Sequence, residues 1–526
     1  MYKNITLLAL TALCLCACKP TPRTARPPKL QPDSEQQPPT PPADEQQPEI
    51  PAPADNSRQT EESAEHALLI VNITRQPHNR LTPWEKQPPS QRRQAATYLG
   101  QGLVLTHGAA LQNATYVELS LPDGTQTVPA RIVRHDNDLA LGLLTVMSPQ
   151  DASIFDTRRP CAIGEPLQRT DRAELWGTLN GNESLRVPLL VQAGSTGSEG
   201  LPRLTLQAEM AVPELYSAGA PVMQDGKLVG LSAGYESTGR KLTVINAELL
   251  RRFLERSQDA PTGVPVLGIE VSTLDDPVFR RYLQLQEGQT GAYISKVLPV
   301  GAAASADVRV GDVITAIEGM PIDNLARCDL PIYGMTHIST AARYLRPLGD
   351  TIRLTVSRSG KTLDISLPLN TDARDKALLR TESPDEAPRY IVWGGLVFQP
   401  LTATYLQTLK TQARGTLPVE FLELEEREKE LLERGMQELT ALTLIIPTPA
   451  TLGYDNLGFC VVEKVNGREP HNFAEFAALL DEPTPCGITE LSINKPPYKI
   501  YMDRAAAEAT NDSLRRSAIP HLRRQD

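Results

Sequence analysis

Two short stretches rich in small residues constrain the fold more than any other part of the chain. They are Gly100-Gln-Gly-Leu-Val-Leu-Thr-His-Gly-Ala-Ala-Leu111 and Leu215-Tyr-Ser-Ala-Gly-Ala-Pro221, with Asp136-Asn-Asp-Leu-Ala-Leu141 between them. Short runs around them, such as Tyr116 to Leu121, alternate with period two and are separated by Asp-Gly turns. Several short strands at such spacing favour a β-sandwich or a β-barrel.

The three stretches resemble the motifs of the trypsin-like domain of the HtrA/Deg family. In that family, Gly-Ser-Gly-Phe leads into Leu-Thr-Asn-Ala-His-Val-Val, and Asp-Leu-Ala and Gly-Asn-Ser-Gly-Gly-Pro follow. The frame fits this sequence without gaps inside each motif. The resemblance implies a trypsin-like double β-barrel, which we place at residues 66–258.

The departures from these motifs fall on the reacting groups. The family's general-base histidine aligns with Ala109 and its nucleophilic serine with Ala218, so only Asp138 keeps the residue that the resemblance implies. A Ser-His-Asp site works because the imidazole takes the hydroxyl proton while the carboxylate fixes its tautomer. Alanine can do neither, and the sequence therefore predicts a pseudoprotease without an intact catalytic site.

His107 and Ser217 lie close in sequence to Ala109 and Ala218 and offer an alternative base and nucleophile. On an extended segment His107 is displaced by roughly 6.6 Å, whereas a nucleophile and its base must approach to about 2.6–3.2 Å. A shift of one residue also turns the Ser217 side chain to the opposite face of a strand. Tyr216 replaces the glycine of the oxyanion-hole turn and is disfavoured if that position needs a positive φ. An active serine endopeptidase using His107, Asp138 and Ser217 stays open as the alternative function.

The first 60 residues are expected to form no part of a folded core. Ile5 to Ala17 is an apolar run too short to span a bilayer. Leu15-Cys-Ala-Cys18 resembles a bacterial lipobox, so residues 1–18 are interpreted as a lipoprotein signal peptide with Cys18 as the lipidated residue. An ordinary secretory signal is the alternative. Residues 19–60, rich in Pro and Gln, are expected to form a disordered tether.

Residues 263–370 resemble a PDZ domain of the HtrA type. The resemblance rests on Val264-Pro-Val-Leu-Gly-Ile-Glu-Val271 and on Val310-Gly-Asp-Val-Ile314. It implies that a peptide adds as an extra β-strand while backbone N–H groups hold its terminal carboxylate. The matching residues are Leu267, Gly268 and Ile269, and a helix from about Thr340 would form the other wall of the groove. Alternatively, Gly268 and Gly311 serve only turns, and neighbouring chain closes the groove.

Residues 371–388 are predicted to be a charged linker, and residues 389–526 a second PDZ-like domain with a C-terminal extension. Tyr390-Ile-Val-Trp-Gly-Gly-Leu-Val-Phe398 resembles the opening of the second PDZ-like domain of plant-type Deg proteases. In the family such domains tend to mediate assembly, and the residues here do not decide between assembly and peptide capture.

Composition excludes several other functions. A net charge of −10 opposes nucleic-acid binding, which needs a basic face. After the signal region, Cys161, Cys328, Cys460 and Cys486 show no spacing typical of a metal site, and we expect neither metal nor cofactor. Cys460 and Cys486 could form a disulfide in an oxidising compartment or remain reduced.

The sequence thus predicts a mainly β, lipid-anchored protein of the bacterial cell envelope, facing the periplasm or the exterior. Its expected fold is a trypsin-like double barrel followed by two PDZ-like α+β domains. We expect it to bind peptides or unfolded envelope proteins in quality control or scaffolding. It is expected to act as a homo-oligomer, or as a hetero-oligomer with an active homologue.

Overall fold

The computed structural model describes residues 67–525, except 182, 198–199, 257–262, 264, 299–300, 370–376, 413–418 and 518. The signal segment 1–18 with Cys18 and the tether 19–60 lie outside the described residues, as does most of the first half of the 371–388 linker. Within the described ranges, no helix has the length and apolar character needed to cross a membrane.

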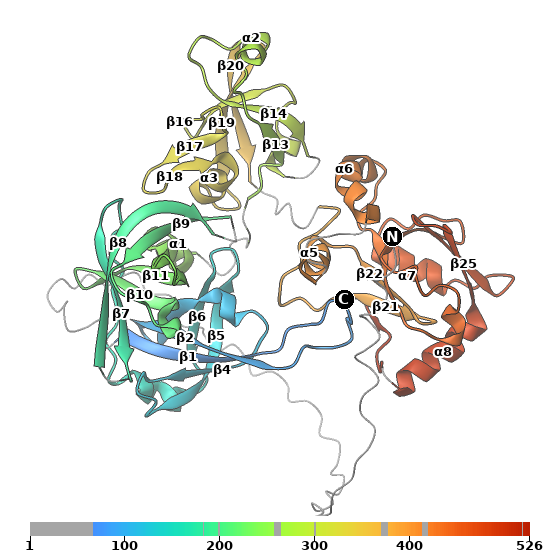
Figure 1. Ribbon diagram of the computed structural model, residues 1–526, viewed down its shortest axis with the longest axis horizontal. Helices are drawn as coiled ribbons and strands as arrows, with labels where there is room; N and C mark the ends of the chain where they lie inside the picture. The colour runs from blue at the N-terminus through green and yellow to red at the C-terminus, as the bar shows by residue number, and fades with distance from the viewer. Residues whose placement is uncertain are drawn as a thin grey trace, which may run out of the picture. The chain divides into compact units, whose positions relative to one another are not determined.

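The first module consists of two closed six-stranded antiparallel barrels (Figure 1). The first barrel has the order β1-β2-β3-β6-β5-β4, with β1 Leu68–Arg75, β2 Ser90–Gly100, β3 Leu103–His107, β4 Ala114–Ser120, β5 Thr127–Asp136 and β6 Leu141–Val146. The second has the order β10-β11-β12-β9-β8-β7, with β7 Arg172–Leu179, β8 Glu183–Thr196, β9 Pro202–Ala208, β10 Ala218–Gln224, β11 Lys227–Glu236 and β12 Lys241–Asn246. The predicted double β-barrel is confirmed.

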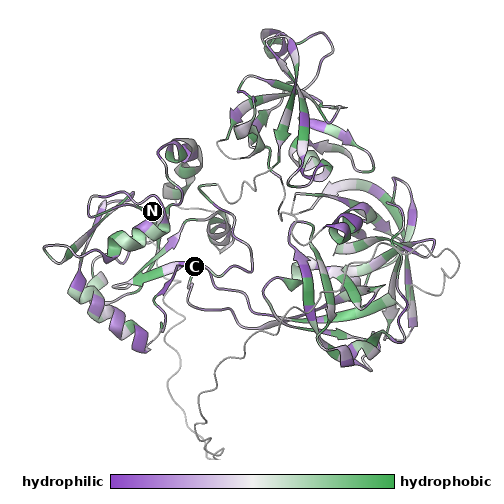
Figure 2. Ribbon diagram, turned by 180° about the vertical axis from the view of Figure 1, so that it is seen from behind, coloured by the Kyte–Doolittle hydropathy of each residue, from purple (hydrophilic) through white to green (hydrophobic). Residues whose placement is uncertain are grey.

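Short 3₁₀ helices and one α-helix complete the first module: η2 Gly108–Leu111, η3 Pro149–Phe155, η4 Glu214–Tyr216 and α1 Ala247–Glu255. Apolar residues concentrate on the barrel strands (Figure 2), and all five residues of β3 are buried. The two barrels meet closely at Gly219, where an added Cβ would lie 2.1 Å from the carbonyl oxygen of Ala95. Glycine also suits its φ of +78°.

The second module is an antiparallel sheet with helices beside it. The sheet order is β13-β14-β15-β19-β20, with β13 Ile269–Ser272, β14 Ala292–Val297, β15 Val313–Ile317, β19 Thr351–Arg358 and β20 Lys361–Pro368. β16 Met320–Pro321 pairs with β15, and β17 Arg327–Leu330 forms a hairpin with β18 Gly334–His337. The helices are α2 Pro277–Tyr282, η5 Ala302–Ser305 and α3 Ile338–Leu345.

The third module is a seven-stranded sheet of order β26-β25-β24-β23-β22-β21-β27. Its strands are β21 Tyr390–Trp393, β22 Leu396–Pro400, β23 Thr440–Ile445, β24 Cys460–Val465, β25 Ile488–Ile493, β26 Lys499–Asp503 and β27 Arg523–Arg524. Its helices are α5 Ala403–Gln412, α6 Val419–Glu433, η6 Pro449–Thr451, α7 Phe473–Asp481 and α8 Arg504–Ser517. Cys460 is buried and Cys486 exposed, and no disulfide joins them in this structure.

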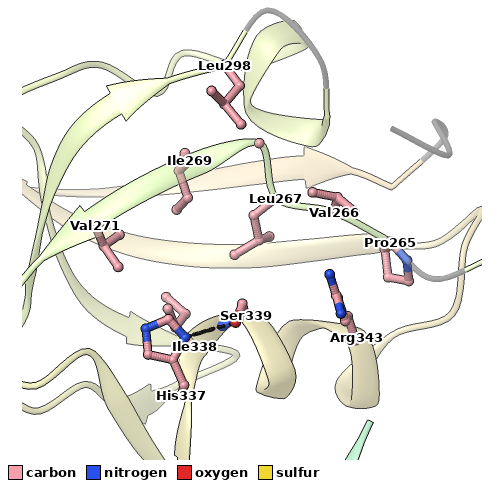
Figure 3. A pocket seen from close by; sticks show the side chains of 11 residues that line it. Pro265, Val266, Leu267, Ile269, Val271, Leu298, His337, Ile338, Ser339 and Arg343 are labelled. Carbon is pink, nitrogen blue, oxygen red and sulfur yellow. Dashed lines mark hydrogen bonds between the residues drawn. The ribbon is translucent and has the colours of Figure 1, made fainter. Parts of the chain in front are cut away.

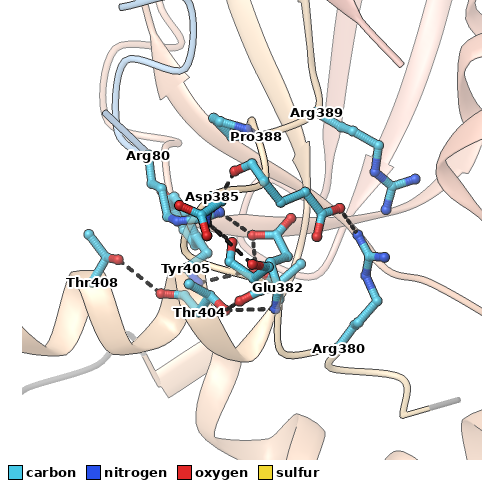
Figure 4. Close-up of polar contacts among 12 residues, drawn as sticks. Arg80, Arg380, Glu382, Asp385, Pro388, Arg389, Thr404, Tyr405 and Thr408 are labelled. Carbon is cyan, nitrogen blue, oxygen red and sulfur yellow. Dashed lines mark hydrogen bonds and ion pairs between the residues drawn. The ribbon is translucent and has the colours of Figure 1, made fainter. Parts of the chain in front are cut away.

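The loop between β1 and β2 carries a buried ion pair with the segment that precedes β21 (Figure 4). The Arg80 guanidinium pairs with the Glu382 carboxylate, and the two side chains are only 10% and 5% exposed. Arg80 also donates to the carbonyl oxygen of Ser383 at 3.1 Å, and Thr402 donates to Glu382 at 3.2 Å. A buried carboxylate is thus held by one cation and one hydroxyl.

Candidate functional site

The two positions that align with a catalytic histidine and serine carry only methyl groups. Ala109 lies in η2, directly after β3 ends at His107, and Ala218 is the first residue of β10. Both are partly exposed. Neither side chain can donate, accept or attack, so the site has no nucleophile and no general base at these positions.

The carboxylate of Asp136 organises the loop that carries Asp138. Asp136 is 6% exposed, and its Oδ1 accepts hydrogen bonds from the backbone N–H groups of Asp138 and Leu139, both at 2.9 Å. Its Oδ2 pairs with Arg256 at 2.9 Å. Asp136 therefore ties the loop that carries Asp138 through two backbone amides and one ion pair.

Tyr216 anchors the turn that precedes Ala218, where the resemblance would place an oxyanion hole. Its side chain is 2% exposed, and its hydroxyl donates to the carbonyl oxygen of Thr178 at 2.8 Å and accepts from the Thr178 N–H at 2.9 Å. The ring lies flat against Gly177, where an added Cβ would come within 2.8–2.9 Å of three ring atoms. The ring and phenol of Tyr216 therefore hold this turn against β7.

The expectation that Tyr216 would be strained by a positive φ does not apply to this backbone. Residues 214–216 form the 3₁₀ helix η4, and the positive φ of the stretch falls on Gly219 instead. The backbone at position 216 therefore accommodates a bulky residue without a positive φ.

The Ser217 hydroxyl forms a hydrogen bond within its own turn. Its Oγ donates to the carbonyl oxygen of Glu214 at 2.6 Å, and its backbone N–H donates to the same oxygen at 3.1 Å. His107 ends β3 with a side chain largely buried, and the Gln94 side chain donates to its carbonyl oxygen at 2.8 Å. A catalytic base would have to remove the Ser217 hydroxyl proton, which here is donated to the carbonyl oxygen of Glu214.

His135 is a second histidine near these residues, on β5. Burial lowers the pKa of its imidazole, and the neighbouring Asp385 carboxylate partly opposes that shift. Its Nδ1 lies 3.9 Å from Asp385 Oδ2. Within the described residues, no group of three or more His, Cys, Asp or Glu side chains could hold a metal ion.

In the second module, β13 is the first strand of the sheet order and pairs only with β14 among the strands that the structure describes. The carbonyl groups of Val266, Leu267 and Gly268 accept hydrogen bonds from the N–H groups of Ala302 at 3.0 Å, Ala303 at 2.8 Å and Leu298 at 2.9 Å. In a planar trans peptide the N–H group points opposite to the carbonyl. The next N–H groups along the chain, those of Leu267, Gly268 and Ile269, therefore point the other way, toward the groove.

Side chains from two elements line this groove (Figure 3). Ile269 and Val271 extend from β13, and Ile338 faces them from the start of α3. The cavity holds about 80 Å³ beside Leu267. Its apolar lining with convergent backbone donors at one end suits the apolar last residue of a peptide and its carboxylate.

Two polar side chains flank the groove at opposite ends of α3. His337 precedes the helix and caps it, because its Nδ1 accepts from the Ser339 N–H at 3.3 Å. Burial lowers its pKa, which favours the neutral ring. Arg343 extends toward Pro265 and Val266 at the other end (Figure 3), where a carboxylate on the backbone donors would meet a positive charge.

The third module lacks an equivalent open edge at its glycine-containing strand. β22, which follows Gly394-Gly395, pairs with β21 through Ile391↔Phe398 and with β23 through Val397↔Leu444. Both of its edges are therefore occupied by the chain itself, so a peptide cannot add to this strand.

Leu267, Gly268 and Ile269 line a cavity in the structure, and their role in holding a peptide stays a prediction. The surroundings of the two alanine positions were not predicted from the sequence. Asp136 escaped notice because Asp138 occupied the motif position. The one available signal was Asp-Asn-Asp, since aspartate often binds amides two residues ahead in its own loop. The contact of Tyr216 with Gly177 had no local signal, because Tyr216 lies in η4 and Gly177 on β7, distant from each other in the chain.

Comparison with known proteins places two stretches in PDZ domain families, residues 265–369 and residues 379–526. The chloroplastic protease Do-like 2 of Arabidopsis thaliana is 23% identical over 442 residues, covering 81% of this chain and 70% of its own length. The periplasmic serine endoprotease DegP of Escherichia coli K12 is 24% identical over 287 residues, covering 52% and 56%. A solved structure of the HtrA-type protease AlgW with a decapeptide superposes with a TM-score of 0.42 at 18% identity, covering 58% of this chain and 95% of that one.

Proposed function

Because the chain belongs to the HtrA/Deg family of trypsin-like proteases with PDZ domains, we propose that it is a pseudoprotease that captures peptides. Its ligands are the carboxyl-terminal segments of unfolded or misassembled proteins of the cell envelope. The second module binds them between β13 and α3, and the double barrel does not cleave them.

The observation that carries this proposal is the contrast between the two sites. The groove has outward-pointing N–H groups at Leu267, Gly268 and Ile269 beside an apolar cavity. The barrel site has alanine at positions 109 and 218 and a tyrosine locked into the adjacent turn. Binding groups are present, whereas reacting groups are absent from the aligned positions.

The same proposal includes attachment to a membrane through a lipid on Cys18, with residues 19–60 as the tether. It also includes assembly into an oligomer, either with itself or with an active homologue. Several grooves in one assembly would raise the avidity for a client that offers more than one chain end.

The groove is tested by fluorescence anisotropy with purified residues 60–526. A labelled peptide with an apolar last residue and a free carboxylate is expected to bind at least about tenfold more tightly than its amidated form. The reason is that the amide loses the charge-assisted hydrogen bonds to the backbone donors, worth roughly 1.5–3 kcal/mol. Equal binding of the two forms would refute carboxylate capture.

A further inference from the structure

The outer edge of β21 in the third module is covered by a short segment that follows α8, residues 519–524. β27, which is part of this segment, pairs with β21 in the antiparallel register Ile391↔Arg523. The Val392 N–H also donates to the carbonyl oxygen of Leu522 at 2.7 Å. The segment thus lies on β21 as an added strand, which is one way in which a domain binds an extended peptide.

Two apolar side chains, three residues apart, anchor the segment. Ile519 is 1% exposed and Leu522 is 5% exposed. Both pack in one small apolar cluster with side chains from β21, β22 and α8. The walls of this pocket therefore come from elements outside the segment.

Two arginines follow the second apolar anchor. Arg523 donates two hydrogen bonds to the carboxylate of Asp481, the last residue of α7, both at 2.6 Å. The Arg524 guanidinium lies 5.4 Å from the centroid of the Tyr390 ring and donates to the carbonyl oxygen of Pro388 at 3.2 Å. A paired contact between a guanidinium and a carboxylate is geometrically specific. The site therefore favours a ligand with a cation directly after its second apolar residue.

The main core of the third module does not include this segment. That core lies between the sheet and α7, and none of its buried members comes from residues 519–524. The segment belongs to the separate small cluster instead. The edge of β21 and its apolar pocket are thus built by the rest of the domain, and residues 519–524 occupy them as a ligand would.

We propose that the outer edge of β21, with its apolar pocket and Asp481, is a binding site for extended segments of the form apolar-x-x-apolar-Arg, which residues 519–524 fill as a tethered ligand. The intended occupant is such a segment of a partner protein, which binds when the tethered segment leaves. The site requires no terminal carboxylate and lies on a different module from the β13 groove, so it does not rest on the proposed function.

The tether decides what kind of ligand can enter. It holds residues 519–524 beside the site at an effective concentration of about 1 mM. The same segment of a second copy makes the same contacts and has no advantage in affinity, so it competes poorly below that concentration. A partner must therefore bind more tightly than the chain's own segment, which favours a different protein over a second copy.

The test uses residues 60–526, which include every described residue, and compares wild type with the variant Leu522→Asp/Arg523→Glu. The tethered segment of this variant loses an apolar anchor and its ion pair. The probe is a fluorescein-labelled peptide with the sequence of residues 519–524, capped at both ends so that it has no terminal carboxylate. The variant is expected to bind the probe at least about tenfold more tightly than wild type, because the tethered segment no longer competes.

Controls on the variant establish where the probe binds. A probe with aspartate in place of Leu522 should bind at least about tenfold more weakly, because it carries a charge into the apolar pocket. Adding Asp481→Asn to the protein should weaken binding about threefold, as for a partly exposed ion pair. Adding Glu482→Gln is the matched control and should change nothing, because Glu482 pairs with Arg468.

Hydrogen–deuterium exchange provides a second readout. Residues 390–392 should exchange faster in the variant than in wild type, and the probe should restore their protection, while residues 460–465 of β24 stay protected throughout. Equal affinity of the two proteins for the probe would overturn the proposal. Loss of protection in β24 would also contradict it, because the segment would then be part of the folded core. Dimerisation of wild type that the variant lacks would assign the site to a second copy and refute the partner protein.

Discussion

At the scale of single residues, the turn beside Ala218 is held by a specific set of side-chain contacts. Tyr216 exchanges two hydrogen bonds with the backbone of Thr178, and its ring uses the space that Gly177 leaves open. Ser217 donates its hydroxyl to Glu214. A histidine at position 109 and a serine at position 218 would leave these contacts of Tyr216 and Ser217 in place.

The fit between Tyr216 and Gly177 gives a stability prediction. Gly177→Ala places a methyl group within 2.8–2.9 Å of the tyrosine ring and is expected to lower the free energy of unfolding by about 1–3 kcal/mol. Urea denaturation followed by circular dichroism measures this change. Gly234→Ala on β11 is the control, because an added Cβ there meets nothing within 4 Å. Equal stability of the two variants would show that the ring does not depend on Gly177.

At the scale of elements, the proposed capture of peptides depends on β13, a short strand that pairs only with β14 among the described strands. β13 pairs with β14 on one side, and its loop turns three N–H groups toward α3. The third module shows the opposite arrangement, since β21 and β23 occupy both edges of β22. Sequence motifs alone could not separate the two modules, because strand pairing depends on segments distant in the chain.

The apolar wall of the groove predicts the effect of a charge placed within it. Val271→Asp is expected to reduce the affinity for a peptide with a free carboxylate about tenfold, because it buries a charge beside an apolar side chain and repels the carboxylate. Ser272→Asp introduces the same charge at the next, exposed residue of the strand, outside the groove lining. Anisotropy titrations of both variants should show a loss for Val271→Asp only, and similar losses would argue against this groove wall.

At the scale of the whole molecule, the motif resemblance to the HtrA/Deg family predicted the double barrel correctly, whereas strand alternation alone favoured only a sandwich or a barrel. The ion pair between Arg80 and Glu382, residues 302 positions apart, had no signal in the sequence. This ion pair affects the protonation of the Glu382 carboxyl. Burial raises the pKa of Glu382, and the Arg80 charge opposes that shift.

Removing the arginine should therefore make stability depend on pH. Arg80→Ala leaves the Glu382 carboxylate buried without its cation and is expected to cost about 3–5 kcal/mol near pH 7. Because the folded-state pKa is raised, the loss grows as the pH rises from the usual glutamate value of 4.5 through that raised value. At or below pH 4.5 the protonated side chain needs no cation, and the loss should shrink.

Urea denaturation at both pH values measures this difference, with Arg80→Ala/Glu382→Gln as the matched control. The double variant carries no charge at either position, so its stability relative to wild type should vary much less with pH. A loss in Arg80→Ala that is the same at both pH values would contradict the role assigned to the buried carboxylate.

The central claim is that the protein binds unfolded chains without cleaving them. In the most direct measurement, purified residues 60–526 are incubated with fluorescent casein, and both proteolysis and complex formation are followed. The Ser217→Ala variant is measured in parallel as the control. The account predicts no cleavage by either protein and equal casein binding by both. Cleavage by the wild type that disappears in Ser217→Ala would contradict it and would establish a displaced catalytic site.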